Sequence, residues 1–226
     1  MKKVFFVVNK LKEFNFKDLL EKYLSDVDVS VGECLPENTE DYDLIILWSY
    51  QKIIPNIKNK KNIILFHSSD LPEGKGWAPI YNVIACNKEY YTISGIFAVD
   101  KVDTGDVIVK AKFKILDNYT AEYIRKWDNE ISIMLTQKIL SRFNKGSLKG
   151  IKQEGIPTYY ERRNSEDNEI MIDSKIIDNL NHFRACEKNH PAFFYYNGFK
   201  YNIFVETAQA PSFPEDIEVI FYGNTA

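Results

Sequence analysis

A run of aliphatic residues that stops at a histidine constrains the fold of this chain more than any other feature. Residues 62–66 read Asn-Ile-Ile-Leu-Phe, which is typical of a strand buried on both faces of a sheet, and His67 follows directly. A loop rich in proline and glycine comes next, and Pro79 then suits the first turn of a helix over residues 79–87. This order of strand, loop and helix predicts an open α/β sheet, whose binding crevice lies beyond the carboxyl ends of its strands.

A second loop, residues 100–106, carries an aspartate in a turn. It joins predicted strands at residues 91–99 and 107–114 and contains the sequence Asp103-Thr104-Gly105. A histidine that follows one strand and an aspartate that follows another lie where open α/β sheets place their chemistry. His67 and Asp103 are therefore the first candidates for catalytic residues.

The ordered set of motifs in these two loops resembles the signature of the 10-formyltetrahydrofolate-dependent formyltransferases. The set begins with His-x-Ser-x-Leu-Pro at residues 67–72 and continues with Lys75-Gly76, where many relatives have Arg-Gly. It then includes the proline-led helix and ends with Asp-Thr-Gly at residues 103–105. The charged segment at residues 157–167 and the Arg-Ala…Pro-Ala-Phe pattern at residues 184–193 resemble segments of the sugar and tRNA formyltransferases. As a whole the chain is most similar to the sugar-nucleotide N-formyltransferases.

One position departs from that signature. The family usually has Asn-x-His, with the asparagine helping to hold the formyl oxygen, whereas this chain has Leu65 there. Some similar sequences combine an apolar residue at this position with an aspartate before Leu-Pro and an asparagine in the helix, as Asp70 and Asn82 do here. The resemblance therefore implies a subfamily trait with Asn82 as the third catalytic residue; the Ser69 hydroxyl or a backbone N–H are the alternative donors.

The predicted elements and the resemblance together imply an α/β fold with a Rossmann-like doubly wound, mostly parallel sheet. A catalytic domain is expected at residues 1–150, with a small C-terminal α+β domain at residues 151–226 that contains a β-hairpin around Asn197-Gly198. Strands are further expected at residues 3–8, 27–32, 43–48, 193–196, 199–205 and 217–221, and helices at residues 16–24, 120–143 and 174–186.

Composition and charge narrow the class of partner. The 226 residues carry a net charge of −3, which argues against a nucleic-acid surface because such surfaces are normally basic. The three cysteines lack metal-ligand spacing, so we predict no metal site and reduced thiols in a cytoplasmic protein. No stretch approaches the roughly 20 apolar residues of a membrane span, so no membrane partner is expected.

The resemblance assigns the loop after the strand at residues 43–48 to one wall of a pterin pocket. Its main-chain groups would contact the cosubstrate, 10-formyltetrahydrofolate. A hinge loop that packs its own isoleucines is the alternative for this segment, and a solvated turn residue is the alternative for Asp100. The predicted cofactor contacts are Ser49, Tyr50, Gln51, Ile53, Ile54 and Asp100.

Polar residues near the predicted strand ends are candidate contacts for the acceptor substrate. Lys75 could meet a phosphate or remain solvated, and Trp77 could stack on a nucleotide base or cap the helix. Solvated turn residues are the alternative for the two contacts after the first strand. The predicted substrate contacts are Asn9, Lys10, Ser69, Asp70, Lys75 and Trp77.

Formyl transfer is an acyl transfer, in which a neutral amine attacks the formyl carbon and an oxyanion forms. The resemblance implies that His67 accepts or relays the amine proton and that Asp103 orients the imidazole. The leading prediction is an N-formyltransferase that acts on a UDP- or dTDP-linked aminodeoxy sugar in surface-polysaccharide or flagellin-sugar biosynthesis. The alternatives are a methionyl-tRNA or ribonucleotide formyltransferase, a 10-formyltetrahydrofolate hydrolase, or a non-catalytic folate- or nucleotide-binding homologue. A homodimer through the C-terminal hairpin or the strands around Asp103 is compatible with the sequence.

Overall fold

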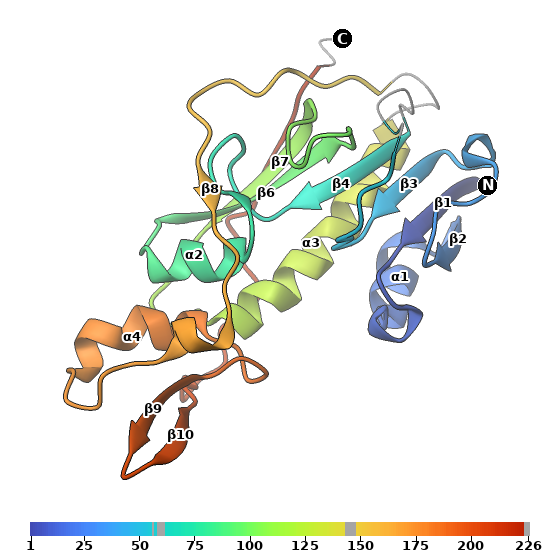
Figure 1. Ribbon diagram of the computed structural model, residues 1–226. Coiled ribbons are helices and arrows are strands. Elements are labelled where there is room, and N and C mark those ends of the chain that lie inside the picture. The colour runs from blue at the N-terminus through green and yellow to red at the C-terminus, as the bar shows by residue number, and fades with distance from the viewer. Residues whose placement is uncertain (56, 58–61, 143–147, 224–226) are drawn as a thin grey trace.

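A mixed sheet organises the computed structural model, which describes residues 1–55, 57, 62–142 and 148–223 (Figure 1). Within these residues the sheet has seven strands in the order β11-β7-β6-β4-β3-β1-β2. Strands β2, β1, β3 and β4 run parallel, and β6 is antiparallel to β4. Strand β7 is antiparallel to β6 and so points the same way as β4, and β11 is antiparallel to β7. The predicted Rossmann-like, mostly parallel α/β fold is therefore confirmed. The strands are β1 (Lys2–Val7), β2 (Val27–Gly32), β3 (Leu44–Leu47), β4 (Ile63–His67), β6 (Tyr90–Phe97), β7 (Val107–Lys114) and β11 (Glu218–Phe221).

Alternating side chains along the central strands divide the core between the two faces of the sheet. Ile46 packs in the largest apolar cluster, which also contains side chains of α1 (Lys17–Leu24), α2 (Pro79–Ala85) and α3 (Ala121–Arg142). Its neighbour Ile45 packs on the other face, in a cluster that includes Ile54 and Ile57 from the loop after β3. Both residues are fully buried, which explains why the central strands read as continuous apolar runs.

Helix α3 supplies much of the helix-covered face. The predicted helix at residues 120–143 corresponds to α3, and residue 143 lies outside the described residues. Ile124, Trp127 and Ile131 recur at three- and four-residue steps and are buried. Burying a large apolar side chain stabilises a fold by about 1.5–3 kcal/mol, so this stripe fixes α3 against the sheet.

The chain after residue 151 forms a small unit and then returns to the sheet. Helix α4 (Ile176–Ala185) packs on α2, and β9 (Ala192–Tyr196) pairs with β10 (Phe199–Ile203) as a hairpin (Figure 1). Asn197 and Gly198 have φ values of 49° and 82°, as the predicted Asn-Gly turn requires. Strand β11 then pairs with β7 at the edge of the main sheet. The division at residue 150 stays a prediction, and residues 224–226 of the predicted second domain lie outside the described residues.

A short parallel pair joins the two parts of the chain. Strand β5 (Lys75–Gly76), in the loop after β4, pairs with β8 (Tyr159–Tyr160). Two residues give no periodic pattern, so this pair was not predicted. The remaining elements are the 3-10 turns η1 (Leu11–Glu13), η2 (Thr39–Asp41) and η3 (Ser165–Asn168). No helix in the described part of the chain is long and apolar enough to span a bilayer.

Candidate active site

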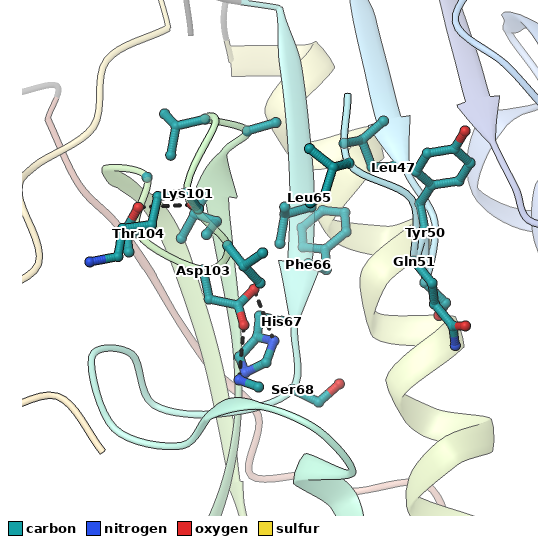
Figure 2. Close-up of a pocket in the computed structure, with 18 of the residues that line it drawn as sticks. Leu47, Tyr50, Gln51, Leu65, Phe66, His67, Ser68, Lys101, Asp103 and Thr104 are labelled. Carbon is teal, nitrogen blue, oxygen red and sulfur yellow. Dashed lines mark hydrogen bonds and ion pairs between the residues drawn. The ribbon is translucent and has the colours of Figure 1, made fainter. Parts of the chain in front are cut away.

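His67 and Asp103 meet at the carboxyl end of β4 (Figure 2). Nδ1 of His67 lies 3.5 Å from Oδ1 of Asp103, and the two residues expose only 8% and 6% of their surface. Nε2 of His67 lies 2.8 Å from the carbonyl oxygen of Gly74. Both ring nitrogens therefore face acceptors, so the imidazole is held between the loop after β4 and the loop after β6.

The backbone around Asp103 is tightly folded. Asp103 has a φ of 52°, in the left-handed region that few residues other than glycine adopt. Its Oδ2 accepts a hydrogen bond from the backbone N–H of Gly76 at 3.0 Å. A Cβ on Gly105 would lie 1.8 Å from the carbonyl oxygen of Phe97. Only glycine fits at this position, which explains why a glycine stands two residues after Asp103.

Gln153 also holds the loop that carries Asp103, and it was not among the predicted site residues. Its Nε2 donates to the carbonyl oxygens of Asp103 and Gly105 at 3.0 and 2.9 Å. Its Oε1 is buried without a hydrogen-bond partner among the described residues. The contact joins positions about fifty residues apart, so neither spacing nor local pattern in the sequence could have indicated it.

A cavity of about 380 Å³ opens beside the His67–Asp103 pair (Figure 2). Its volume lies within the roughly 300–1,000 Å³ typical of small-molecule sites. Leu47, Leu65 and Ile96 give it apolar walls, and the loops at residues 49–54 and 98–105 add main-chain polar groups. Every predicted cofactor contact lines it: Ser49, Tyr50, Gln51, Ile53, Ile54 and Asp100. Apolar walls with polar backbone edges suit a flat heteroaromatic ring such as a pterin.

The loop at residues 49–54 is shaped by contacts that the sequence had assigned to ligands. The Nδ2 of Asn9 donates to the carbonyl oxygen of Ser49 at 2.7 Å, and the backbone N–H of Gln51 donates to Oδ1 of Asn9 at 3.1 Å. Oδ1 of Asp100 accepts from the backbone N–H of Ile57 at 3.2 Å. In this structure Asn9 therefore organises the wall of the cavity, and its role as a substrate contact stays a prediction.

Four other predicted site residues make their polar contacts with groups of this same chain. Lys10 pairs with Glu13 in solvent, and the exposed Asp70 pairs with Lys110. The buried Ser69 donates to the carbonyl oxygen of Glu73 at 2.7 Å, and Asn82 donates to the carbonyl oxygens of Trp77 and Ala78 at 3.3 and 2.9 Å. None of the four belongs to the cavity lining formed by the described residues. The structure does not bring Asn82 to the His67–Asp103 pair, so its catalytic role stays a prediction.

Lys75 and Trp77 occupy contrasting positions in the loop after β4. Lys75 is buried, and burial lowers the pKa of its ammonium group, opposed by the nearby Asp103 carboxylate. Trp77 lines the cavity with 42% of its surface exposed, and the Arg162 guanidinium lies 4.9 Å from its ring centroid. Trp77 therefore offers an aromatic platform at the cavity, whereas Lys75 lies inside the protein and outside the cavity lining, so its role as a substrate contact stays a prediction.

A second polar cluster lies beside the cavity, and its residues were not among those predicted from the sequence. Ser68 lines the cavity, and its hydroxyl donates to Oδ1 of Asp128 at 3.0 Å. The Tyr91 hydroxyl donates to the same oxygen at 2.7 Å. Arg125, also in the lining, pairs with Glu187. Successive strand residues point to opposite faces of the sheet. The position of Ser68 directly after His67 was therefore the sequence signal that could have indicated a second polar cluster on the opposite face.

Among the described residues, no group of three or more His, Cys, Asp or Glu side chains could hold a metal ion.

Residues 33–140 match the family model described as formyl transferase. The chain is 29% identical over 147 residues to the methionyl-tRNA formyltransferase of Bacillus mycoides (strain KBAB4), covering 63% of this chain and 47% of that protein. It is 26% identical over 204 residues to the methionyl-tRNA formyltransferase of Syntrophomonas wolfei, covering 86% of this chain and 65% of that protein. The chain thus spans only part of the length of these relatives.

Solved structures with the same fold include several kinds of protein. A methionyl-tRNA formyltransferase from Clostridium thermocellum superposes with a TM-score of 0.72 at 22% identity, covering 98% of this chain and 100% of that one. A 4-N formyltransferase from Francisella tularensis gives 0.71 at 17% identity, covering 92% and 99%. HypX from Aquifex aeolicus in complex with tetrahydrofolic acid gives 0.71 at 17% identity, covering 95% and 40%.

Proposed function

We propose that the chain, whose residues 33–140 match the formyl transferase model, transfers a formyl group from 10-formyltetrahydrofolate to the amine of a nucleotide-linked aminodeoxy sugar. The observation that carries the proposal is the His67–Asp103 pair at the edge of a cavity of suitable size. Neither residue is exposed, so the electrostatic interaction between them is weakly screened by solvent.

The pair supplies what attack by an amine requires. As the amine nitrogen bonds to the formyl carbon it becomes acidic and must lose a proton, and imidazole suits this task near neutral pH. The bond between the formyl carbon and N10 of the folate would then break, and the proton taken from the amine would pass to N10 so that tetrahydrofolate leaves. Asp103 lies beside Nδ1 and stabilises the positive charge that His67 gains when it accepts the proton. The carbonyl oxygen of Gly74 holds the other ring nitrogen, so the ring keeps its orientation.

The cavity residues suit the formyl donor. 10-Formyltetrahydrofolate would supply the activated formyl group. The apolar side chains of Leu47, Leu65 and Ile96 would cover a pterin ring, and main-chain groups of residues 49–54 would bind its polar edge. Leu65 provides surface and no hydrogen bond here, so the developing oxyanion must be met by a backbone N–H or by another side chain.

Two observations favour a nucleotide sugar as the acceptor. Trp77 presents an exposed aromatic face in the cavity lining, a surface on which a nucleobase can stack. The net charge of −3 is unsuited to a tRNA backbone. The matched relatives named methionyl-tRNA formyltransferase favour the second candidate, an enzyme of that kind, and the chain covers 47% and 65% of the length of two of them.

Purified protein tests the proposal directly. We expect formation of tetrahydrofolate from 10-formyltetrahydrofolate only when a dTDP- or UDP-linked aminodeoxy sugar is added, and not with methionyl-tRNA. His67→Asn should lower kcat by about 10²- to 10⁴-fold, the usual contribution of an acid–base group. His190→Asn, at an exposed histidine outside the cavity lining, is the matched control and should leave kcat unchanged. Turnover with methionyl-tRNA and not with the sugar would show that the acceptor is tRNA and overturn the proposed substrate. No turnover with any acceptor would overturn the whole proposal.

A further inference from the structure

Ser68 occupies the position directly after His67, on the other face of the sheet. Leu65 and Ile63 pack on the loop-covered face, and His67 follows them at steps of two residues. Ser68 follows Phe66, which packs against the helix-covered core. Figure 2 shows the two side chains diverging from the end of β4, and both line the cavity. The cavity is therefore bordered by an imidazole on one side and a hydroxyl on the other.

The orientation of the Ser68 hydroxyl is set by Asp128 on α3. The hydroxyl donates to Oδ1 of Asp128 at 3.0 Å, and the buried Tyr91 hydroxyl donates to the same oxygen at 2.7 Å. Burial raises the pKa of the Asp128 carboxyl, while its two hydrogen bonds and the charges of Arg125 and His67 lower it. A carboxylate only accepts hydrogen bonds, so the proton of Ser68 points to α3 and its oxygen lone pairs remain available to the cavity.

An oxygen that only accepts, placed beside His67, suits a ligand group that donates. We propose that Ser68 accepts an N–H of the acceptor amine and that Asp128 is the positioning residue that keeps the serine in this accepting orientation. The inference rests on the proposed N-formyltransferase function and adds the group that recognises the nucleophile. One N–H held by Ser68 leaves the nitrogen lone pair free for attack and orients it in the cavity that His67 also borders.

The cluster could instead serve only to fix α3 against the sheet, and the two hydrogen bonds on Oδ1 allow these roles to be separated. Tyr91→Phe removes one bond from the same oxygen inside the core and leaves the Ser68–Asp128 bond in place. Ser68→Ala removes the other bond together with the accepting oxygen. The two variants lose one hydroxyl each, so they are matched for the hydrogen bond that the fold loses.

The experiment measures kcat, the KM of each substrate and thermal unfolding for the unaltered protein, Ser68→Ala, Ser68→Thr, Asp128→Asn and Tyr91→Phe. The acceptor is the dTDP- or UDP-linked aminodeoxy sugar that gives turnover, and the KM of the folate cosubstrate is followed separately. We expect Ser68→Ala to lower kcat/KM for the acceptor by about tenfold to a hundredfold, the value of one hydrogen bond to a polarised group, with the KM of the folate unchanged. Asp128→Asn should show a similar loss, and Ser68→Thr, which keeps the hydroxyl, should restore most of the activity.

Tyr91→Phe should lower the unfolding temperature about as much as Ser68→Ala and retain acceptor kcat/KM. Equal losses of kcat/KM in Ser68→Ala and Tyr91→Phe would overturn the inference and make the cluster structural. Full activity of Ser68→Ala would overturn it while leaving the proposed function intact. An unaltered protein that transfers formyl groups to no amine overturns the proposed function and this inference with it.

Discussion

Gln153→Ala is expected to release the loop that carries Asp103. The Gln153 amide donates two hydrogen bonds, at 3.0 and 2.9 Å, to the carbonyl oxygens of Asp103 and Gly105. Each such bond contributes about 0.5–1.5 kcal/mol, so the variant should lose about 1–3 kcal/mol of unfolding free energy. Removing Oε1, a buried acceptor without a partner among the described residues, offsets part of this loss.

The effect on catalysis should exceed the effect on stability. Asp103 has a φ of 52°, and the Gln153 amide is the hydrogen-bond donor that restrains its carbonyl group. A shift of the carboxylate by about 1 Å relative to His67 can cost up to about 10² in rate. We therefore expect kcat to fall at least tenfold while the KM of the folate cosubstrate changes little.

Thermal unfolding and steady-state kinetics on the same preparations measure both effects. At about 2–4 °C per kcal/mol for a domain of this size, the unfolding temperature should fall by several degrees. Gln153→Glu should be worse than alanine, because a carboxylate oxygen would face two carbonyl oxygens. Lys152→Ala, at the exposed neighbouring position, is the control and should behave like the unaltered protein. Unchanged kcat in Gln153→Ala would refute the idea that this amide positions Asp103.

Three further perturbations test other parts of the structure. Gly105→Ala should lower both stability and kcat, because its Cβ would lie 1.8 Å from the carbonyl oxygen of Phe97; thermal unfolding and kinetics measure this. Burial raises the pKa of Cys186 to about 11, so in a thiol-labelling time course at pH 8 it should react after the exposed Cys34 and Cys86. Burial lowers the pKa of His182 below 6.5, so its contribution to stability is complete above that pH and is lost as the pH falls through and below it. His182→Gln should flatten this part of the curve of unfolding free energy against pH.

Sequence patterns predicted the sheet well because its signals are local. The apolar run that becomes β4 and the Asn-Gly turn between β9 and β10 each follow from a few consecutive residues. The meeting of His67 with Asp103 does not follow from strand ends alone, because β6 is antiparallel to β4 and its last residue, Phe97, pairs with Ile64. The loop after β6 turns back along the sheet to bring Asp103 to His67. The face of the sheet on which a strand residue lies can also be predicted, because side chains two positions apart along a strand point to the same face.

The contacts that complete the site could not be predicted in this way. Asn9 bonds the backbone of a loop forty residues away, and Ser68 bonds a helix residue sixty positions later. A polar residue beside a strand end can contact either a ligand or a neighbouring loop. The same residue types serve both purposes, so the sequence does not distinguish them. For Asn9 the loop contact is what the structure contains, and only the three-dimensional arrangement distinguishes the two.

The segment that holds the loops of His67 and Asp103 lies outside the residues that match the family model. The match ends at residue 140, yet Gln153 holds the Asp103 loop, the Thr158 hydroxyl accepts the N–H of Gly74 at 2.8 Å, and β8 pairs with β5. Gly74 in turn presents the carbonyl group that faces Nε2 of His67. A catalytic unit that ended at residue 150 would keep His67 and Asp103 but lose the contacts that set their geometry. The candidate active site is therefore completed by residues 153–160, which contact the loops of both His67 and Asp103.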